Sequence, residues 1–145
     1  MHWAFQVLAV SDDDNGYRYP DEVVLTLLQN QKHDYRRAAN FVNTTPDVEL
    51  LIVQHEYGIY GGADGEYLLE LVRLLRKPFV LVAHTILPQP SERQSQILTE
   101  LCQLAAGIVC MTRQSAQMLI DLYVAPPDLV TVIAHGVPLF KRYPG

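Results

Sequence analysis

Hydrophobic residues along this chain form short continuous runs, and between the runs they recur every three or four positions. The runs are too short for helices and predict six strands, at 3–10, 23–28, 50–54, 79–83, 108–111 and 129–134. The periodic segments predict four helices with one apolar face, at 34–43, 64–76, from Ser91 to the breaker Gly107, and at 112–123. Regular alternation of strands and helices predicts a Rossmann-like three-layer α/β/α fold, with a mostly parallel sheet covered on both faces.

The first two predicted strands are an exception, because no helical pattern separates them. The connection from Ser11 to Pro20 carries aspartates, Asn15-Gly16 and a closing proline, which are typical of turns and loops. Parallel neighbours are normally joined by a crossover helix. We therefore expect these two strands to form an antiparallel edge pair at the N-terminus.

Length and charge restrict the function classes further. The chain has 145 residues, enough for one domain with a substantial core. Its net charge is −5 and its basic residues are scattered, which argues against a nucleic-acid surface. No apolar run is long enough to span a membrane, and no secretory signal is found. Cys102 and Cys110 lack metal-ligand spacing and predict buried thiols in a reducing, cytoplasmic compartment.

Three histidines, His55, His84 and His135, each come directly after a predicted strand. The carboxyl ends of parallel strands meet at one edge of a sheet, where α/β proteins bind ligands. These imidazoles are therefore expected to line one cleft, although a single histidine at a strand end is often only a hydrogen-bonded loop residue. A zinc site is disfavoured because the spacings match no common ligand pattern.

The segment Leu50–Gly62 combines a buried strand with a polar, glycine-rich loop, and several of its residues have two interpretations. Glu56 is either a general acid or base, or a surface carboxylate. Tyr57 and Tyr60 either stack on a sugar or pack the loop down. Gly61-Gly62 either offers amides to a phosphate or makes a tight turn, with Asp64 capping the helix that follows. Thr112, after the fifth strand, either binds an anion or caps a helix.

Four ordered motifs make the chain resemble the bacterial family 4 (group 1) glycosyltransferases, in the half that precedes the nucleotide-sugar domain. They are HEYGIYGG at 55–62 with DGEYLL at 64–69, LVAHTIL at 81–87, VCMT at 109–112 and VIAHGVP at 132–138. The resemblance implies the acceptor-side Rossmann-like half of a GT-B glycosyltransferase. Such enzymes transfer a sugar from a nucleotide-sugar with retention of configuration, without a general need for metal or another cofactor.

The resemblance also implies residue roles. His84 corresponds to the histidine that faces the transferred sugar or the acceptor, and is the expected catalytic residue. The expected substrate-binding residues are His55, Glu56, Tyr57, Gly58, Gly61, Gly62, Thr85 and Thr112. His135 and Gly136 correspond to the entry of the hinge. We therefore expect one acceptor-side domain at 1–138 and the start of an interdomain linker at 139–145.

Departures from the family pattern define the alternatives. Similar full-length proteins begin with an additional strand, a glycine-rich loop and a helix, and continue into a donor half; here the pattern is truncated at both ends, and Ala134 replaces the usual proline. We expect a split or truncated enzyme that is inactive without its donor half and that takes a sugar or lipid-linked sugar as acceptor. The alternative is a non-catalytic carbohydrate- or anion-binding remnant. A hydrolase using His84 and Glu56 is disfavoured, since no nucleophile elbow is present.

The absent first strand has a structural consequence. In the common doubly wound order that strand lies at the centre of the sheet, so the remaining strands would be left with two unpaired edges. We expect residues 4–10 to close the sheet by pairing with 50–54. Self-association through the open edges, or pairing with a donor-domain chain, is the second possibility.

Overall fold

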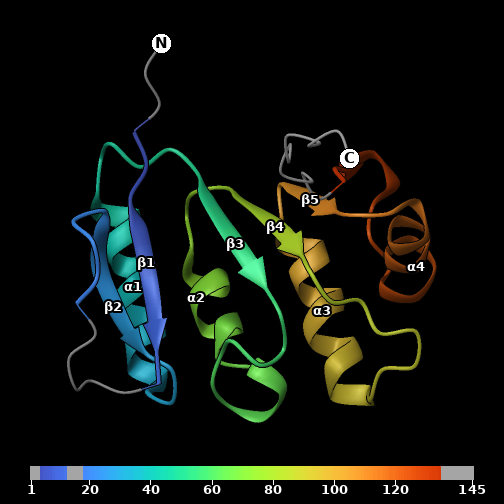
Figure 1. The fold of residues 1–145 in the computed structure, drawn as a ribbon, viewed down its shortest axis with the longest axis horizontal. Helices are drawn as coiled ribbons and strands as arrows, with labels where there is room; N and C mark the ends of the chain where they lie inside the picture. Colours follow the sequence, from blue (N-terminus) through green and yellow to red (C-terminus); the bar gives the residue numbers. More distant parts are fainter. Residues whose placement is uncertain (1–3, 13–17, 135–145) are drawn as a thin grey trace, which may run out of the picture.

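The fold is an α/β arrangement of six strands and four helices (Figure 1). The computed structural model describes residues 4–12 and 18–134. The strands are β1 (Val7–Ser11), β2 (Val23–Leu28), β3 (Leu51–His55), β4 (Phe79–Ala83), β5 (Gly107–Cys110) and β6 (Val130–Val132). The helices are α1 (Lys32–Thr44), α2 (Leu68–Leu74), α3 (Glu92–Leu104) and α4 (Arg113–Tyr123), with short 3-10 turns η1 (Ala63–Gly65) and η2 (Pro127–Leu129).

The strands form two parallel sheets. β1 pairs with β2, and a separate four-stranded sheet has the order β3-β4-β5-β6. Its register aligns Leu51 with Phe79 and Ile108 with Val130, so the apolar positions of neighbouring strands lie on the same face. The prediction of a Rossmann-like α/β fold with mostly parallel strands is confirmed.

The prediction of an antiparallel edge pair is wrong, because β1 and β2 run parallel. The segment 12–22 that joins them is longer than either strand. At about 3.3 Å a residue, it can run back along β1 without any helix. A crossover helix is the usual solution for a parallel pair, but only the length of the connection is a physical requirement.

The prediction of helices on both faces is also wrong for the part of the chain that the structure describes. Figure 1 shows α1, α2 and α3 behind the strands, on one side of the sheet layer, and α4 packs against α3. Side chains that alternate along β3 agree with this arrangement, because Val53 is buried whereas Ile52 is exposed. Right-handed connections that step repeatedly in one direction place their helices on the same face. A helix on the other face would have to belong to a connection that steps in the opposite direction. The connection from β1 to β2 is the one that does so, and its described residues form no helix.

The sheet does not close between β1 and β3. These strands belong to different sheets, so the expected pairing of residues 4–10 with 50–54 is wrong. One apolar core nevertheless joins the two sheets: Leu8 and Val10 of β1 pack against the same buried cluster as Leu51 of β3. Helices α1 and α2 continue this cluster through Tyr35, Ala38, Leu68 and Leu71. Side-chain packing therefore holds the sheets together where the backbone ladder is interrupted.

Residues close to the ends of the helices and strands determine where most of these elements begin and end. Ser91 and Gln94 form a capping box at the start of α3, and Thr112 caps α4 by accepting a hydrogen bond from the N–H of Ser115 at 2.9 Å. The predicted helix 64–76 is shorter than expected. Asp64 adopts a left-handed conformation (φ 55°) inside η1 instead of capping a helix, and α2 begins only at Leu68.

Both cysteines are buried free thiols, as the sequence predicts. In the part of the chain that the structure describes, no helix has both the length and the apolar character needed to cross a membrane.

Candidate functional site

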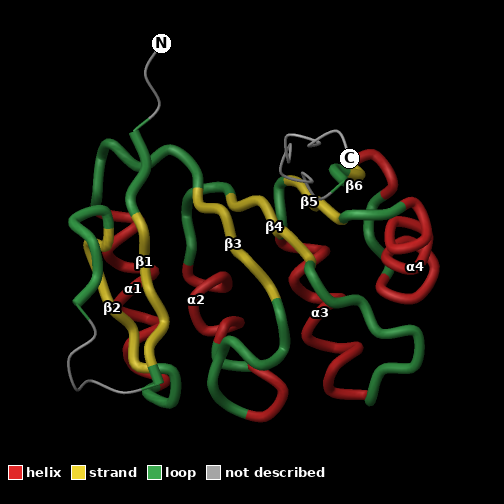
Figure 2. The backbone as a smooth tube through the Cα atoms, viewed as in Figure 1, coloured by secondary structure: helices red, strands yellow, loops and turns green. Residues whose placement is uncertain are grey.

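The polar loops that follow the strands gather at one end of the molecule. Figure 2 shows the loops after β2, β3 and β4 together at the end where the strand arrows of Figure 1 point. The parallel pairing of β3 with β4 places His55 beside Ala83, directly before His84. The backbone N–H of His84 donates to the carbonyl of His55 at 3.1 Å. The structure therefore brings these two histidines together, as the sequence predicts.

His55 is a buried residue of β3. Its side chain is fully buried, and neither ring nitrogen has a hydrogen-bond partner among the described residues. The ring meets that of Tyr57 edge-on at 5.0 Å between centroids, and that of Tyr60 nearly parallel at 6.3 Å. Burial, with a smaller contribution from the charge of His84, lowers the pKa of His55 to about 4. His55 is therefore neutral at pH 7 and cannot itself reach a ligand in solvent.

His84 has the opposite environment, because its side chain is exposed at the end of β4. Its Nε2 lies 2.5 Å from the side-chain Oε1 of Gln54. An amide oxygen can only accept, so Nε2 carries the proton of this bond. Gln54 thus favours one orientation of the imidazole and the tautomer that is protonated at Nε2.

The glycine-rich loop is attached to the first half of the chain by Gln29 and Tyr35. The hydroxyl of Tyr35 donates to the carbonyl of Gln29 at 2.8 Å and accepts from the N–H of Gly61 at 3.0 Å. The side-chain Nε2 of Gln29 donates to the carbonyls of Gly58 and Ile59 at 3.2 and 3.0 Å. The loop is therefore fixed by hydrogen bonds to residues about 30 positions earlier in the chain.

Close approach explains the glycine at position 61. A Cβ there would lie 1.9 Å from the carbonyl oxygen of Gln29, which no side chain permits. Gly62 has a positive φ of 78°, the left-handed region that favours glycine. Gly58, in contrast, is exposed, and a Cβ added there would meet nothing within 4 Å. The N–H of Gly61 already donates to Tyr35, so this amide is engaged within the protein.

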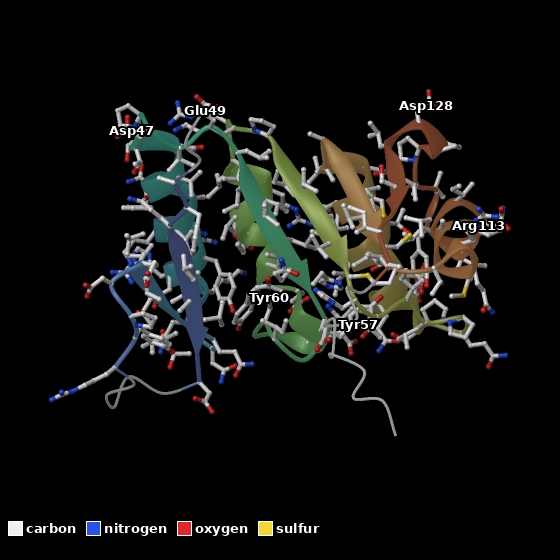
Figure 3. All side chains as sticks on the ribbon, turned by 45° about the horizontal axis from the view of Figure 1, so that its top comes forward. Asp47, Glu49, Tyr57, Tyr60, Arg113 and Asp128 are labelled. Carbon is white, nitrogen blue, oxygen red and sulfur yellow. The ribbon has the colours of Figure 1, made fainter. Side chains whose placement is uncertain are left out.

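The two loop tyrosines pack against the protein. The hydroxyl of Tyr60 donates to the carbonyl of Gln54, and that of Tyr57 donates to the carbonyl of Gln94 at 3.3 Å. Burial raises the pKa of both phenols, so they remain protonated donors at neutral pH. Figure 3 shows Tyr57 at the tip of β3 and Tyr60 on the side toward β1.

The remaining predicted residues lie at the same end of the sheet or outside the described part of the chain. Glu56 is exposed directly after β3, and Thr85 is half-buried after His84. The hydroxyl of Thr112 caps α4. His135 and Gly136, the predicted hinge residues, lie outside the described residues.

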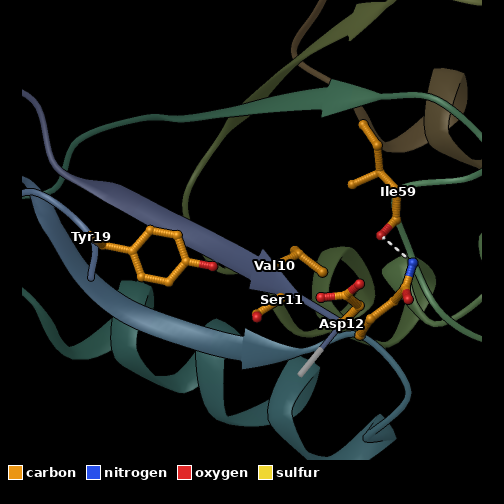
Figure 4. Close-up of a pocket in the computed structure, with 6 residues that line it drawn as sticks. Val10, Ser11, Asp12, Tyr19 and Ile59 are labelled. Carbon is orange, nitrogen blue, oxygen red and sulfur yellow. Dashed lines mark hydrogen bonds between the residues drawn. The ribbon is translucent and has the colours of Figure 1, made fainter. Parts of the chain in front are cut away.

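A cavity of about 430 Å³ opens beside this loop. Figure 4 shows the end of β1 on one side of it and Ile59, hydrogen-bonded to Gln29, on the other. Its lining residues are Val10, Ser11, Asp12, Tyr19, Gln29 and Ile59. A carboxylate, an amide and a phenol beside apolar walls are groups that can orient a small polar ligand.

The site thus contains one exposed and oriented imidazole, one buried neutral imidazole, an exposed carboxylate and a rigid glycine loop. Among the described residues, no group of three or more His, Cys, Asp or Glu side chains is placed to hold a metal ion. The arrangement can hydrogen-bond and position a hydroxyl-rich ligand at the carboxyl ends of β3 and β4.

Comparison with known families identifies the chain. The sequence model of Glycosyltransferase Family 4 matches residues 5–140. The chain belongs to glycosyltransferase family 4. No curated protein and no solved structure matches the chain. The family 4 match covers every described helix and strand, so the site belongs to a glycosyltransferase-type domain.

The sequence analysis did not identify Gln29, Tyr35 and Gln54, which hold the glycine-rich loop and His84 in place. Gln54 is polar within an otherwise apolar strand, and this was the one available signal. Gln29 and Tyr35 are far from the site in the sequence, so only the fold shows their role.

Proposed function

We propose that this chain is the acceptor-side half of a retaining glycosyltransferase that requires a donor-binding half for activity. The observation that carries the proposal is His84, an exposed imidazole oriented by Gln54 at the carboxyl end of β4, in a chain of glycosyltransferase family 4. A ligand-facing histidine at this position suits hydroxyl-rich substrates, because one ring nitrogen is fixed by the protein.

The proposed reaction transfers a sugar from a nucleotide-sugar to an acceptor hydroxyl. The bond between the anomeric carbon and the phosphate oxygen breaks, and the nucleoside diphosphate leaves with the electron pair. A bond forms between the anomeric carbon and the acceptor oxygen, whose proton passes to the departing diphosphate oxygen. Both reactants must be held together for this exchange, so the acceptor-side half alone is inactive.

Each site residue has a role in this proposal. His84 faces the transferred sugar or the acceptor, while the loop His55–Gly58 forms the acceptor side of the cleft. In this loop, the side chain of Glu56 is exposed and can contact the acceptor directly. The side chain of His55 is buried and supports the loop from the core. Thr85 follows His84 directly, the Gly61-Gly62 turn belongs to the same acceptor-side loop, and Thr112 contributes at the end of β5.

The proposal divides the chain into an acceptor-side domain at 1–138 and the beginning of a linker at 139–145, with His135 and Gly136 at the hinge. The partners are a sugar or lipid-linked sugar acceptor and, through a donor-binding half, a nucleotide-sugar. The proposed chemistry requires neither a metal ion nor an organic cofactor, and the enzyme is proposed to act in the cytoplasm.

Calorimetry tests the proposal that the nucleotide-sugar is bound by the donor-binding half and not by this chain. Titration of the chain with common UDP- and GDP-sugars is expected to give no heat of tight binding, since the donor site belongs to the other half. A binding isotherm in the micromolar range from any of these sugars would contradict the acceptor-half proposal.

Substitution tests the role of His84. When a donor-binding half restores transfer, His84→Ala is expected to lower turnover by about 100-fold or more, the scale for a group that acts on the transition state. His33→Ala is the matched control, because His33 is exposed on α1. Equal, small effects of both substitutions would show that His84 is only structural.

A second candidate function is a non-catalytic module that binds carbohydrates or anions. The cavity beside Asp12, Tyr19 and Gln29 favours it, because this chain forms the cavity alone. The neighbouring coding sequence distinguishes the two functions. A reading frame for a donor-binding domain supports the split enzyme, and its absence supports the binding module.

A further inference from the structure

The first turn of α3 contacts two loops of the candidate site. α3 begins at Glu92, directly after the loop 84–91 that carries His84 and Thr85. Figure 1 shows this start of α3 at the end of the molecule where the loops after β3 and β4 gather. Gln94, in the first turn of α3, makes hydrogen bonds toward both loops.

On one side, Gln94 closes the end of the loop after β4. Its backbone N–H donates to the Oγ of Ser91 at 3.1 Å, and its side-chain Oε1 accepts from the N–H of Ser91 at 2.9 Å. The middle of the same loop is held by the hydroxyl of Tyr123, which donates to the carbonyl of Leu87 at 2.5 Å. The loop after β4 is therefore fixed both at its middle and at its end.

On the other side, Gln94 contacts the glycine-rich loop after β3 and the turn that follows it. Its carbonyl accepts from the hydroxyl of Tyr57 at 3.3 Å, and its Nε2 donates to the Oδ1 of Asp64 at 3.5 Å. The neighbouring Arg93 forms an ion pair with Glu66, which holds the same segment against α3. Gln94 therefore joins two loops that lie about 30 positions apart in the sequence.

Helix capping alone does not explain the amide of Gln94. The capping box needs a side-chain oxygen at this position, and glutamate supplies that oxygen as well as glutamine does. The contact with Asp64 needs a side-chain donor, which glutamate lacks. A glutamate here would also place a second carboxylate beside that of Asp64, and like charges repel. The amide nitrogen is therefore specific to the contact between the two loops.

We propose that Gln94 is a positioning residue of the candidate acceptor site, which holds the glycine-rich loop and the loop after β4 at a fixed separation. Glu56 adjoins Tyr57 on the first loop, and Thr85 lies shortly before Leu87 on the second. An acceptor held between the loops meets both side chains in a geometry that Gln94 maintains. This role in acceptor binding rests on the proposed glycosyltransferase function, whereas the contact between the loops does not.

Gln94→Glu separates the positioning role from helix capping. The variant keeps the oxygen that accepts from the N–H of Ser91, but it loses the donor to Asp64. Hydrogen exchange of the full chain reports the effect through the amide of Ile59, which donates to the carbonyl of Glu56 at 3.3 Å within the glycine-rich loop. We expect exchange of this amide to become at least about threefold faster in the variant.

A second substitution should restore the contact with its polarity reversed. Asp64→Asn supplies a side-chain donor, and asparagine tolerates the left-handed conformation (φ 55°) at this position. In the double variant, Asn donates to the new carboxylate at position 94. Exchange of the Ile59 amide should then return to within about twofold of the wild-type rate. A general loss of helix or loop stability is not reversed in this way.

Gln117→Glu is the matched control. The side chain of Gln117 donates to the carboxylate of Asp121 at 2.9 Å within α4, so the substitution makes the same chemical change at a site that does not join the loops. Exchange of the Ile59 amide should keep its wild-type rate. An equal acceleration in this control would overturn the proposal, because added negative charge would then explain the effect. Unchanged exchange in Gln94→Glu, or no recovery in the double variant, would also overturn it.

Relaxation dispersion gives a second readout at the candidate site itself. Amides of residues 56–58 should show motion on the microsecond-to-millisecond timescale in Gln94→Glu, and this motion should disappear in the double variant. Neither measurement needs a substrate or a donor-binding half, so both test Gln94 separately from sugar transfer. A chain that shows the recovery but transfers no sugar when a donor-binding half is present would contradict the proposed function and not the contact between the loops.

Discussion

The hydroxyl of Tyr35 accepts a hydrogen bond from the backbone N–H of Gly61 at 3.0 Å. Tyr35 lies on α1, and Gly61 lies in the loop after β3. The same hydroxyl donates to the carbonyl of Gln29, so one buried side chain connects the end of β2 with the glycine loop. This contact joins the carboxyl ends of the two sheets, between which the described residues form no backbone ladder.

Removal of this hydroxyl should loosen the loop. Tyr35→Phe leaves the N–H of Gly61 and the carbonyl of Gln29 without their partner. We expect the free energy of unfolding to fall by about 1–3 kcal/mol, the cost of unsatisfied buried polar groups. Exchange of the Gly61 amide should become faster. Tyr67→Phe is the control. The ring centroid of Tyr67 lies 5.9 Å from that of Tyr35, but its hydroxyl takes no part in the hydrogen bonds to Gln29 and Gly61. Equal losses in the two variants would contradict the role of the Tyr35 hydroxyl.

Two glycines of the same loop should respond differently to alanine. Gly61→Ala places a Cβ 1.9 Å from the carbonyl oxygen of Gln29, so the loop or the end of β2 must move. We expect a loss of about 2–4 kcal/mol in unfolding free energy. Gly58→Ala meets open space and should change stability by less than about 0.5 kcal/mol. Denaturant unfolding of both variants measures the difference, and similar values would show that the close approach is not maintained in solution.

His55 should make stability depend on pH. Its pKa is lowered from 6.5 to about 4 by burial, so the unfolded chain binds the proton more readily than the folded chain. The stability from the neutral imidazole is complete above pH 6.5 and is lost as the pH falls toward 4, by about 3 kcal/mol in total. Unfolding free energies between pH 7.5 and 4.5 measure this loss.

A variant assigns that pH dependence to one residue. His55→Leu removes the titrating group from the same buried position, and its stability should vary less with pH over this range. His33→Ala, on the exposed side of α1, should keep the slope of the wild-type chain. An unchanged slope in His55→Leu would assign the titration to other groups.

Gln54 should act as a positioning residue for His84. Gln54→Met removes the oxygen that accepts from Nε2, so the tautomer that is protonated at Nε2 is expected to lose population. Gln54→Glu keeps an oxygen acceptor and should keep the proton on Nε2. Nitrogen NMR shifts of the His84 ring distinguish these states without any substrate. A ring that holds the same tautomer in Gln54→Met would contradict the role of Gln54.

The local elements of this protein could be predicted from the sequence. The bounds of β2 and β4 agree with the predicted runs, and Ser91 and Thr112 cap their helices as their neighbours indicate. These features depend on residues a few positions apart, so composition and spacing contain the needed information. The gathering of His55 and His84 at one end could also be predicted, because parallel strands bring their carboxyl ends to one edge.

The parallel pairing of β1 with β2 and the open edge between β1 and β3 were decided only by the tertiary structure. The residues of 12–22 favour a loop, but the loop does not indicate in which direction the next strand returns. The separation of the sheets depends on packing of Leu8 and Val10 against a core built from distant helices. Such contacts are not encoded in local periodicity.

The environments of His55 and His84 also depend partly on local sequence and partly on tertiary structure. Each histidine follows an apolar run, and the sequence determined that both lie at strand ends. β3 begins and ends one residue later than predicted, so His55 is its last residue and shares the buried face of Leu51 and Val53, whereas His84 directly follows the buried Ala83 of β4 and is exposed. Side chains alternate between faces with a period of two, so His55 is in phase with the buried positions of its strand and His84 is out of phase with those of β4. Which face is buried is decided by the helices packed against the sheet, which only the tertiary structure supplies.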